Sequence, residues 1–434
     1  MRQRRALIIG GSLGGLFAAN VLRASGWDVH VFERVNDDLA SRGAGIGTHE
    51  EMFAVMRRIG LHVDESIGVY PAGRRCLDSA GRVVREDTIP RMLSSWSLFY
   101  RALKDALPAE RYHFAKALTG VAQDGDSVTA TFADGTHANG DLLVAADGIR
   151  SSVRALLMPE VQPRYAGYVA WRGVLHESEM APELHAAVFE HYLYCLPEGE
   201  QIIAYPVPGP DDDVRPGRRS YNWVWYHPVD AAALRDLCTD AKGRVHPLGI
   251  APPLIRPQVI KDIRAIAHRV LAPQIAQVID RTPQPFFQAI YDLEAPGMVQ
   301  GRVALLGDAA FVARPHVGMG VTKAALDAQC LADSLTAAGD DMVAALARYD
   351  ARRRLFGTRV IARARKLGAH LEAQVSKPRE ERTAEELHQD PAVVMREVGA
   401  RLCEIPELAE LVGQLKQNDA KDAKVKRKDA KDYK

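Results

Sequence analysis

The pattern of apolar and polar residues opens with an apolar run, a glycine-rich turn and a longer amphipathic stretch. Residues 6–9 predict a short buried strand, residues 16–24 predict a helix that Gly26 ends, and residues 29–32 predict a second buried strand. A second α/β stretch covers roughly residues 95–160 and ends in "DLLVAADGIRSSVR", where an apolar strand runs into Asp147. The N-terminal part of the chain therefore predicts an α/β unit that begins strand, helix, strand.

The pattern of residue types along the chain changes between residues 163 and 290. The segments "YVAWRGVL", "QIIAYPVPG" and "YNWVWYHPV" are aromatic and alternating, which is typical of strands in a separate sheet. The segment "RVALLGDAA" then has the α/β pattern of the N-terminal part again. Residues 321–335 have apolar side chains at helical spacing. The first domain is therefore predicted to be discontinuous in sequence.

These changes predict the domain boundaries. The α/β domain comprises residues 1–75, 95–162 and 290–340, and the mostly β domain comprises residues 76–94 and 163–289. A helix is expected over residues 341–375, followed by a charged extension over residues 376–434 whose final stretch "NDAKDAKVKRKDAKDYK" has the composition of a disordered tail.

Composition and charge restrict the classes of partner. The 434 residues are 47% hydrophobic, which suffices for two packed domains, and 56 basic side chains nearly balance 55 acidic ones. This balance favours a small-molecule substrate and gives no indication of a nucleic acid or membrane partner. The five cysteines are scattered without a CxxC pair, so we expect reduced thiols, no metal site and a cytoplasmic location. The apolar run near the N-terminus is too short for a signal sequence.

The turn "IIGGSLGG" carries a candidate dinucleotide fingerprint. G-x-G-x-x-G fits as Gly10, Ser12 and Gly15, with serine at the second glycine position. The turn follows a strand and opens a helix, and Glu33 lies at the offset expected of a ribose-binding acid. The alternative is a tight turn with an unrelated surface glutamate.

The same letters also spell G-x-S-x-G, the nucleophile elbow of serine hydrolases, with Ser12 as the nucleophile. An elbow strand normally follows several other strands, whereas this motif follows the first strand of the chain. The sequence also lacks an HGGG-type oxyanion segment. Both observations disfavour hydrolysis.

Four motifs in order carry a resemblance to a known family. These are "GGSLGGL" with Glu33, "RGAGI" at 42–46, "LVAADGIRSSVR" at 143–154 and "VALLGDAAFVARPHVGMG" at 303–320. Over residues 5–365 the chain resembles the single-component FAD-dependent aromatic hydroxylases, especially those that act on hydroxylated pyridines. It departs from most of them at Phe311, where histidine is usual.

The resemblance implies a Rossmann-like FAD-binding domain with a mostly β-sheet substrate domain inserted, and C-terminal helices. It implies FAD as cofactor, NADH or NADPH as co-substrate, O₂, a small aromatic substrate, and a homodimer. Asp308 matches the acceptor for the ribitol hydroxyls, Asp147 the Asp-Gly motif, and Arg101 the arginine that reaches toward the FAD phosphates. The implied cofactor-binding residues are Gly10, Ser12, Leu13, Gly14, Gly15, Glu33, Arg34, Arg42, Gly45, Arg101, Asp147, Asp308, Pro315, Gly318 and Gly320.

The implied reaction inserts one oxygen atom into an electron-rich ring through a flavin C4a-hydroperoxide. A base near the ring hydroxyl would help, and histidine has a suitable pKa. His316 and His49 are the candidates, although either can equally be structural. The aromatic strands suggest a dry substrate pocket, with Tyr205, Tyr221, Trp223 and Tyr226 as candidates, although alternating aromatics also pack sheet faces.

Two other functions share this fold. The chain is alternatively an epoxidase or halogenase, although a halogenase needs a tunnel lysine that the sequence does not indicate. A non-catalytic flavin-binding role is the other possibility. No second strand–GxGxxG–helix unit and no redox cysteine pair occur, which argues against the disulfide reductases with two dinucleotide domains.

Overall fold

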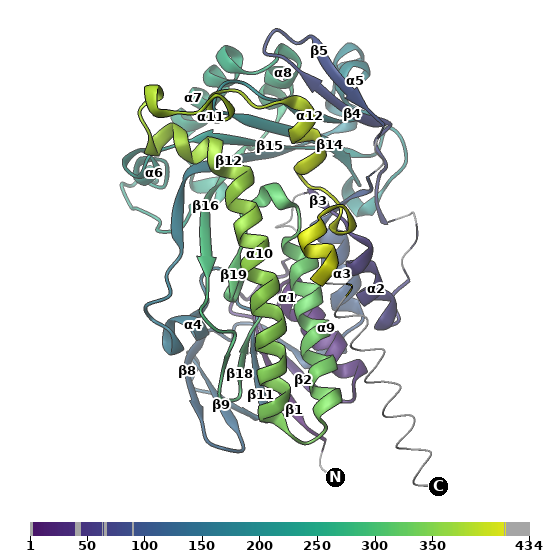
Figure 1. Ribbon diagram of the computed structural model, residues 1–434, viewed down its shortest axis with the longest axis vertical. Coiled ribbons are helices and arrows are strands. Elements are labelled where there is room, and N and C mark those ends of the chain that lie inside the picture. Colours follow the sequence, from purple (N-terminus) through teal and green to yellow (C-terminus); the bar gives the residue numbers. More distant parts are fainter. Residues whose placement is uncertain are drawn as a thin grey trace.

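Two sheets of different character organise the molecule (Figure 1). The computed structural model describes residues 3–39, 45–62, 64, 67–88, 91–411 and 413. Within these ranges, a six-stranded sheet has the order β17-β18-β11-β1-β2-β7 and an eight-stranded sheet has the order β19-β16-β12-β15-β14-β13-β4-β5. The structure is the predicted α/β fold with a mostly β insertion.

The six-stranded sheet is built on short apolar runs. Its strands β1, β2, β7, β11 and β18 are parallel, and the edge strand β17 is antiparallel. Parallel strands need cover on their faces, and α1 (Leu13–Ala24) packs on β1, β2 and β11 with α9 (Gly320–Ala338) beside it. The strands are β1 (Arg5–Ile9), β2 (Asp28–Phe32), β7 (Tyr112–His113), β11 (Leu142–Ala145), β17 (Val299–Gln300) and β18 (Val303–Leu305).

The eight-stranded sheet is mostly antiparallel and uses the long aromatic segments. Its strands are β4 (Gly73–Leu77), β5 (Val83–Asp87), β12 (Arg164–His176), β13 (His191–Cys195), β14 (Gln201–Val207), β15 (Ser220–Pro228), β16 (Phe286–Glu294) and β19 (Phe311–Val312). The predicted domain boundaries after residues 75 and 289 fall inside β4 and β16. Two smaller sheets join β8 (Leu118–Gln123), β9 (Val128–Phe132) and β10 (His137–Gly140), and β3 (Gly45–Gly47) with β6 (Leu93–Ser95).

The two faces of the eight-stranded sheet have different cover. One face packs Trp171, Trp223 and Trp225 against α5, α7 and α8. The opposite face carries Tyr168 and Tyr226 together with other tyrosines, and it is turned toward the parallel-sheet domain. The α-helices are α1 (Leu13–Ala24), α2 (Glu50–Arg58), α3 (Trp96–Asp105), α4 (Ser152–Leu157), α5 (Pro182–Val188), α6 (Ala231–Leu237), α7 (Pro257–Val270), α8 (Pro273–Arg281), α9 (Gly320–Ala338), α10 (Met342–Ser376), α11 (Ala384–Leu387) and α12 (Pro391–Glu397).

The long helix α10 connects the two domains. Figure 1 shows it beside α9 and running up to the eight-stranded sheet, which it contacts through β12, β15 and β16. The chain after α10 turns back, and Leu402, Ile405 and Leu408 pack against Phe356 and Val360 of α10. Part of the predicted charged extension is therefore structured, and the final stretch from residue 418 lies outside the described residues. None of the helices in the described ranges is both long and apolar enough to span a bilayer.

Candidate active site

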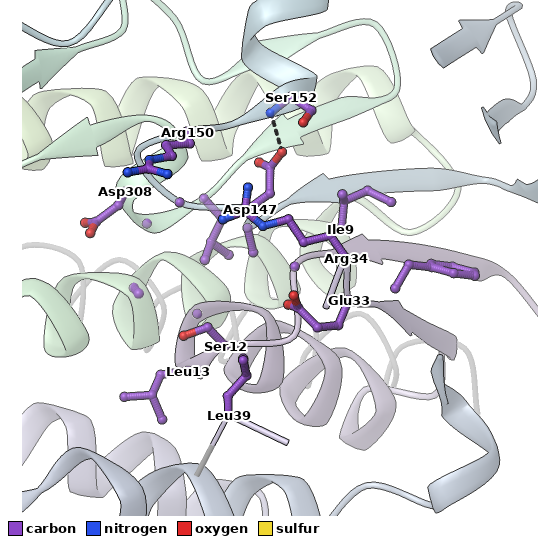
Figure 2. Close-up of a pocket in the computed structure, with 18 of the residues that line it drawn as sticks. Ile9, Ser12, Leu13, Glu33, Arg34, Leu39, Asp147, Arg150, Ser152 and Asp308 are labelled. Carbon is purple, nitrogen blue, oxygen red and sulfur yellow. Dashed lines mark hydrogen bonds between the residues drawn. The ribbon is translucent and has the colours of Figure 1, made fainter. Parts of the chain in front are cut away.

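The carboxyl ends of four parallel strands surround one elongated cavity of about 420 Å³, here called the strand-end cavity (Figure 2). Gly10 and Ser12 follow β1, Glu33 follows β2, Asp147 follows β11, and Asp308 follows β18. Ligands of open α/β sheets bind at this edge, because the loops that follow the strands diverge there. The five residues come from distant parts of the sequence and meet only through the sheet order.

The glycines of the first turn allow a close approach of backbone to backbone. Gly10 has φ +103°, and a Cβ there would lie 2.5 Å from the carbonyl oxygen of Ala146. A Cβ on Gly15 would lie 1.9 Å from the carbonyl oxygen of Gly10. Helix α1 therefore starts directly at the cavity. Its N-cap Ser12 forms no side-chain capping bond, so the amides of the first turn remain available to a ligand phosphate.

Glu33 closes the glycine turn. Its carboxylate accepts hydrogen bonds from the amides of Gly11, at 2.8 Å, and Val35, at 3.0 Å. The side chain is buried yet lines the strand-end cavity beside Arg34. Glu33 therefore holds the loop and borders the strand-end cavity.

Asp147 and Asp308 place carboxylate groups at the strand-end cavity. These groups lack some or all of the hydrogen-bond partners that the described residues could supply. Asp147 accepts from the amides of Ser152, at 2.7 Å, and Val153, and its other oxygen is buried without a partner among the described residues. No described residue donates to Asp308, whose exposed side chain lines the same cavity (Figure 2). Burial raises the pKa of both carboxyls, and Lys323 opposes the rise at Asp308. Both groups are suited to accept hydrogen bonds from ligand hydroxyls.

A second cavity of about 240 Å³, here called the tyrosine cavity, lies between the tyrosine face of the eight-stranded sheet and the loop before α9. Tyr192, Tyr205 and Tyr226 line one side. Gly45, Pro315, His316 and Gly318 line the other, and Gly318 has φ +60°. The two cavities share Asp308, Gly320 and Val321, so they meet at the N-terminus of α9. An elongated ligand in the first cavity can therefore reach a small one in the second.

Comparison with known proteins identifies the family. A model described as "FAD binding domain" matches residues 3–77 and 261–364, and one described as "FAD binding domain-like" matches residues 165–292. The chain is 32% identical to 2,6-dihydroxypyridine 3-monooxygenase of Paenarthrobacter nicotinovorans, over 85% of this chain and 91% of that protein. The chain belongs to the single-component FAD-dependent aromatic hydroxylases.

Other relatives agree with this assignment. The FAD-dependent urate hydroxylase of Klebsiella pneumoniae is 31% identical over 80% of this chain and 85% of its own length. The solved structure of 2,6-dihydroxypyridine-3-hydroxylase from Arthrobacter nicotinovorans superposes with a TM-score of 0.80 at 30% identity, covering 88% of this chain and 95% of that one. The chain is therefore an FAD- and NAD(P)H-dependent monooxygenase, and these relatives favour ring hydroxylation over the epoxidase or halogenase alternative.

The described residues of this hydroxylase fit FAD. The glycine turn accepts no side chain, the first turn of α1 has free amides, and Asp147 and Asp308 have oxygens without protein partners. The serine hydrolase alternative fails at the same place. Ser12 lines the strand-end cavity, but no described histidine lines it with Ser12, so a nucleophilic serine would lack its base.

The two candidate histidines of the hydroxylase have different surroundings. His316 lines the tyrosine cavity, and its Nε2 lies 3.0 Å from the hydroxyl of Tyr168, while its Nδ1 is buried without a partner in the described chain. Burial holds the pKa of His316 well below its usual range, so the ring is neutral at neutral pH. Tyr226 lies against it, with ring centroids 4.1 Å apart.

His49 has the surroundings of the structural alternative. Its Nδ1 lies 2.9 Å from the hydroxyl oxygen of Thr322 and its Nε2 3.4 Å from the carbonyl oxygen of Ala400, and it lines neither cavity. Burial lowers its pKa to about 3. Its position corresponds to a structural histidine that joins α2, α9 and the C-terminal segment.

The candidate aromatic residues divide between the two faces of the sheet. Tyr205 and Tyr226 line the tyrosine cavity. Tyr221 and Trp223 point to the other face, where the Tyr221 hydroxyl donates to the carbonyl of Val188 and Trp223 Nε1 donates to Thr282. The prediction that they line the substrate pocket is therefore wrong, because successive residues of a strand face opposite sides.

The candidate Arg101 forms an ion pair away from the strand-end cavity. The structure pairs Arg101 with Asp212, and Arg101 does not line the strand-end cavity. The structure therefore does not place Arg101 at this cavity, and its contact with the FAD phosphates stays a prediction. Arg42 lies outside the described residues. Sequence analysis missed Arg91 and Arg172, which line the tyrosine cavity; the only signal for Arg172 was its position in "YVAWRGVL", on an alternating strand.

Proposed function

We propose that the enzyme inserts one oxygen atom of O₂ into the ring of a hydroxylated pyridine or a related phenol. The observation that carries this proposal is the junction of the two cavities at Asp308, Gly320 and Val321. The elongated cavity suits a dinucleotide, and the smaller one, walled by tyrosines, suits a single aromatic ring. The two ligands would meet at the start of α9.

The residues that would hold FAD line the strand-end cavity and its junction with the tyrosine cavity. Glu33 and Arg34 border the adenosine end, and the turn from Gly10 through Leu13 and Gly14 to Gly15 faces the pyrophosphate. Asp308 is placed for the ribitol hydroxyls. The loop with Pro315, Gly318 and Gly320, opposite Gly45, would contact the flavin ring. FAD supplies the chemistry of taking electrons from NAD(P)H and activating O₂.

The protein side chains then prepare the aromatic ring. The start of α9 directs backbone amides toward the junction, and a helix N-terminus stabilises a nearby negative charge by about 0.3–1 kcal/mol. Tyr205 and Tyr226 are buried and keep the tyrosine cavity dry. His316 is neutral through burial, and its Nδ1 has no partner among the described residues, so it can form a hydrogen bond with a ring hydroxyl.

The substrate class draws support from the relative named 2,6-dihydroxypyridine 3-monooxygenase, which is similar over most of both chains. A ring hydroxyl donates electron density to the ring, and oxygen transfer to carbon requires an electron-rich ring. We also propose a homodimer, which size-exclusion chromatography with light scattering would check.

The experiment is anaerobic reduction of the bound flavin by NADH and by NADPH, followed at the visible absorbance band. It is run in the presence of single hydroxypyridines, phenols and hydroxybenzoates. ¹⁸O₂ is then admitted, and the mass of the product is measured by mass spectrometry. Faster reduction with one ring class and a gain of one labelled oxygen support the proposal. A protein that reduces its flavin and only releases hydrogen peroxide with every ring contradicts it.

A further inference from the structure

The C-terminal part of the chain supplies a wall of the tyrosine cavity. Val398 and Gly399 line this cavity together with tyrosines of β13, β14 and β15. They belong to residues 391–408, here called the C-terminal strap, which Figure 1 shows running from α12 toward α9. The last of the four motifs that resemble the hydroxylase family ends at residue 320. A segment outside these motifs therefore borders the cavity proposed for the ring.

Apolar side chains dock both halves of the strap. In the first half, Val394 and Met395 are buried in the same apolar cluster as the tyrosines of the cavity. Glu397 pairs with Arg363 of α10 at 2.8 Å. In the second half, the side chains that pack against α10 and the loop before α9 are Ala400, Leu402, Ile405 and Leu408. The strap is therefore a packed part of the fold on both sides of the cavity-lining residues.

Gly399 joins the strap to the loop before α9 through its backbone. Its amide donates to the carbonyl oxygen of His316 at 2.8 Å. It has φ +62°, and a Cβ there would lie 2.4 Å from a terminal nitrogen of Arg91. The carbonyl oxygen of the next residue, Ala400, lies 3.4 Å from Nε2 of the buried His49. The main chain of the strap is therefore fixed against the loop that carries His316.

Val398 is the side chain that the strap presents to the cavity, because Gly399 has none. It is 3% exposed and packs in the apolar cluster that contains Tyr205 and Tyr226. A β-branched side chain has few rotamers, and the hydrogen bond at Gly399 holds the adjoining backbone. A wall of this kind yields little when a methyl group is added in front of it.

We infer that Val398 limits the size of the ring that the enzyme accepts, and that the docked C-terminal strap keeps it in position to do so. This inference rests on the proposed function, which supplies the aromatic ring as the ligand of the tyrosine cavity. It adds a specificity-determining residue that comes from the C-terminal strap, outside the cofactor motifs. The substrate range of the enzyme then depends on the packing of the strap as well as on the sheet and the α9 loop.

The test uses rings that differ by one methyl group. One series is phenol with the three cresols, and the other is 2,6-dihydroxypyridine with its 3-methyl and 4-methyl derivatives. Dissociation constants are measured from the quenching of flavin fluorescence in the FAD-loaded protein. Each derivative is expressed as a factor relative to its parent ring. We expect at least one methyl position to weaken binding to the wild-type protein by about 10-fold or more.

The variants assign this size limit to Val398. Val398→Ala removes two methyl groups from the wall and should bring the factor at the sensitive position to near one. Val398→Ile adds a methylene group and should weaken even the parent ring by about 10-fold, which keeps the test decisive if Val398→Ala fails to fold. Val393→Ala is the matched control, because Val393 lies on α12 and is 43% exposed. It should keep every factor of the wild-type protein.

Three results would overturn the inference. The first is a wild-type protein that binds every methyl derivative as tightly as its parent ring. The second is wild-type factors at every position in Val398→Ala, or wild-type affinity for the parent ring in Val398→Ile. The third is an equal loss of the size limit in Val393→Ala, which would assign the effect to a general loosening of α12. A merely structural role of Val398 would alter stability and leave the factors unchanged.

The same preparations separate this inference from the proposed function. Rings that the wild-type protein and Val398→Ala both hydroxylate with one and the same size limit refute only the role of Val398. If the wild-type protein neither binds nor hydroxylates any ring, the proposed function fails, and the inference fails with it.

Discussion

We expect Asp308 to bind the cofactor and Asp327 to stabilise the fold. Alanine substitutions of these two residues should therefore have opposite effects on FAD affinity and on apoprotein stability. Asp308 receives no hydrogen bond from a described residue, and its raised pKa means that folding favours the protonated carboxyl. Such a group stabilises the fold at acid pH and loses that contribution as pH rises through its folded pKa. At pH 7, Asp308→Ala should therefore leave the free energy of unfolding of the apoprotein unchanged or slightly raise it.

The same substitution should weaken FAD binding. If the carboxylate accepts one hydrogen bond from a ribitol hydroxyl, its loss costs about 1.5–3 kcal/mol, or about 10- to 150-fold in the dissociation constant. FAD is removed, unfolding is followed in urea, and FAD affinity is titrated by the quenching of flavin fluorescence. Wild-type affinity for FAD in Asp308→Ala would refute the role assigned to this residue.

Asp327→Ala is the control with the opposite expectation. Asp327 is buried, accepts from the amide of Gly307 at 3.0 Å, and pairs with buried Arg353 at 2.5 Å. Its removal leaves a buried guanidinium without its partner, which costs about 3–5 kcal/mol in apoprotein stability. If both variants destabilised the apoprotein equally, the distinction between them would be wrong.

The remaining predictions concern folding, pH and the two sheet faces. Gly15→Ala should abolish soluble expression or markedly lower the urea midpoint, because its Cβ would lie 1.9 Å from a backbone oxygen; a wild-type midpoint would contradict this. His49 has a folded pKa of about 3, so stability should fall as pH drops from about 6.5 toward 3, by at most about 1.4 kcal/mol per pH unit from this group. His49→Gln should make that pH profile flatter, and an unchanged profile would argue against a neutral buried His49. Trp223→Phe loses its hydrogen bond to Thr282 and should cost about 1 kcal/mol of stability at unchanged KM, whereas Tyr226→Ala should raise KM; a raised KM in Trp223→Phe would contradict the assignment of faces.

The local sequence determined the elements and the cofactor turn. The strand and helix of the first unit, predicted at residues 6–9 and 16–24, lie within β1 (Arg5–Ile9) and α1 (Leu13–Ala24). Short-range sterics explain this success. A glycine with φ +103° and a helix packed on it at van der Waals distance tolerate very few side chains, so the turn is visible as a motif.

Only the tertiary structure decided which side chains share a cavity. Tyr221 and Tyr226 lie on one strand and face opposite layers, and no local pattern tells which face meets the cofactor domain when both are buried. Arg91, which precedes β6, and Arg172 of β12 line the same cavity because the fold brings together segments from different sheets. The sequence by itself thus determined the glycine turn, because the turn depends on local backbone geometry. It also indicated the fold class and FAD, because four motifs in order resemble those of the aromatic hydroxylases. The charge and lining of the substrate cavity were decided by long-range packing between segments that the sequence keeps far apart.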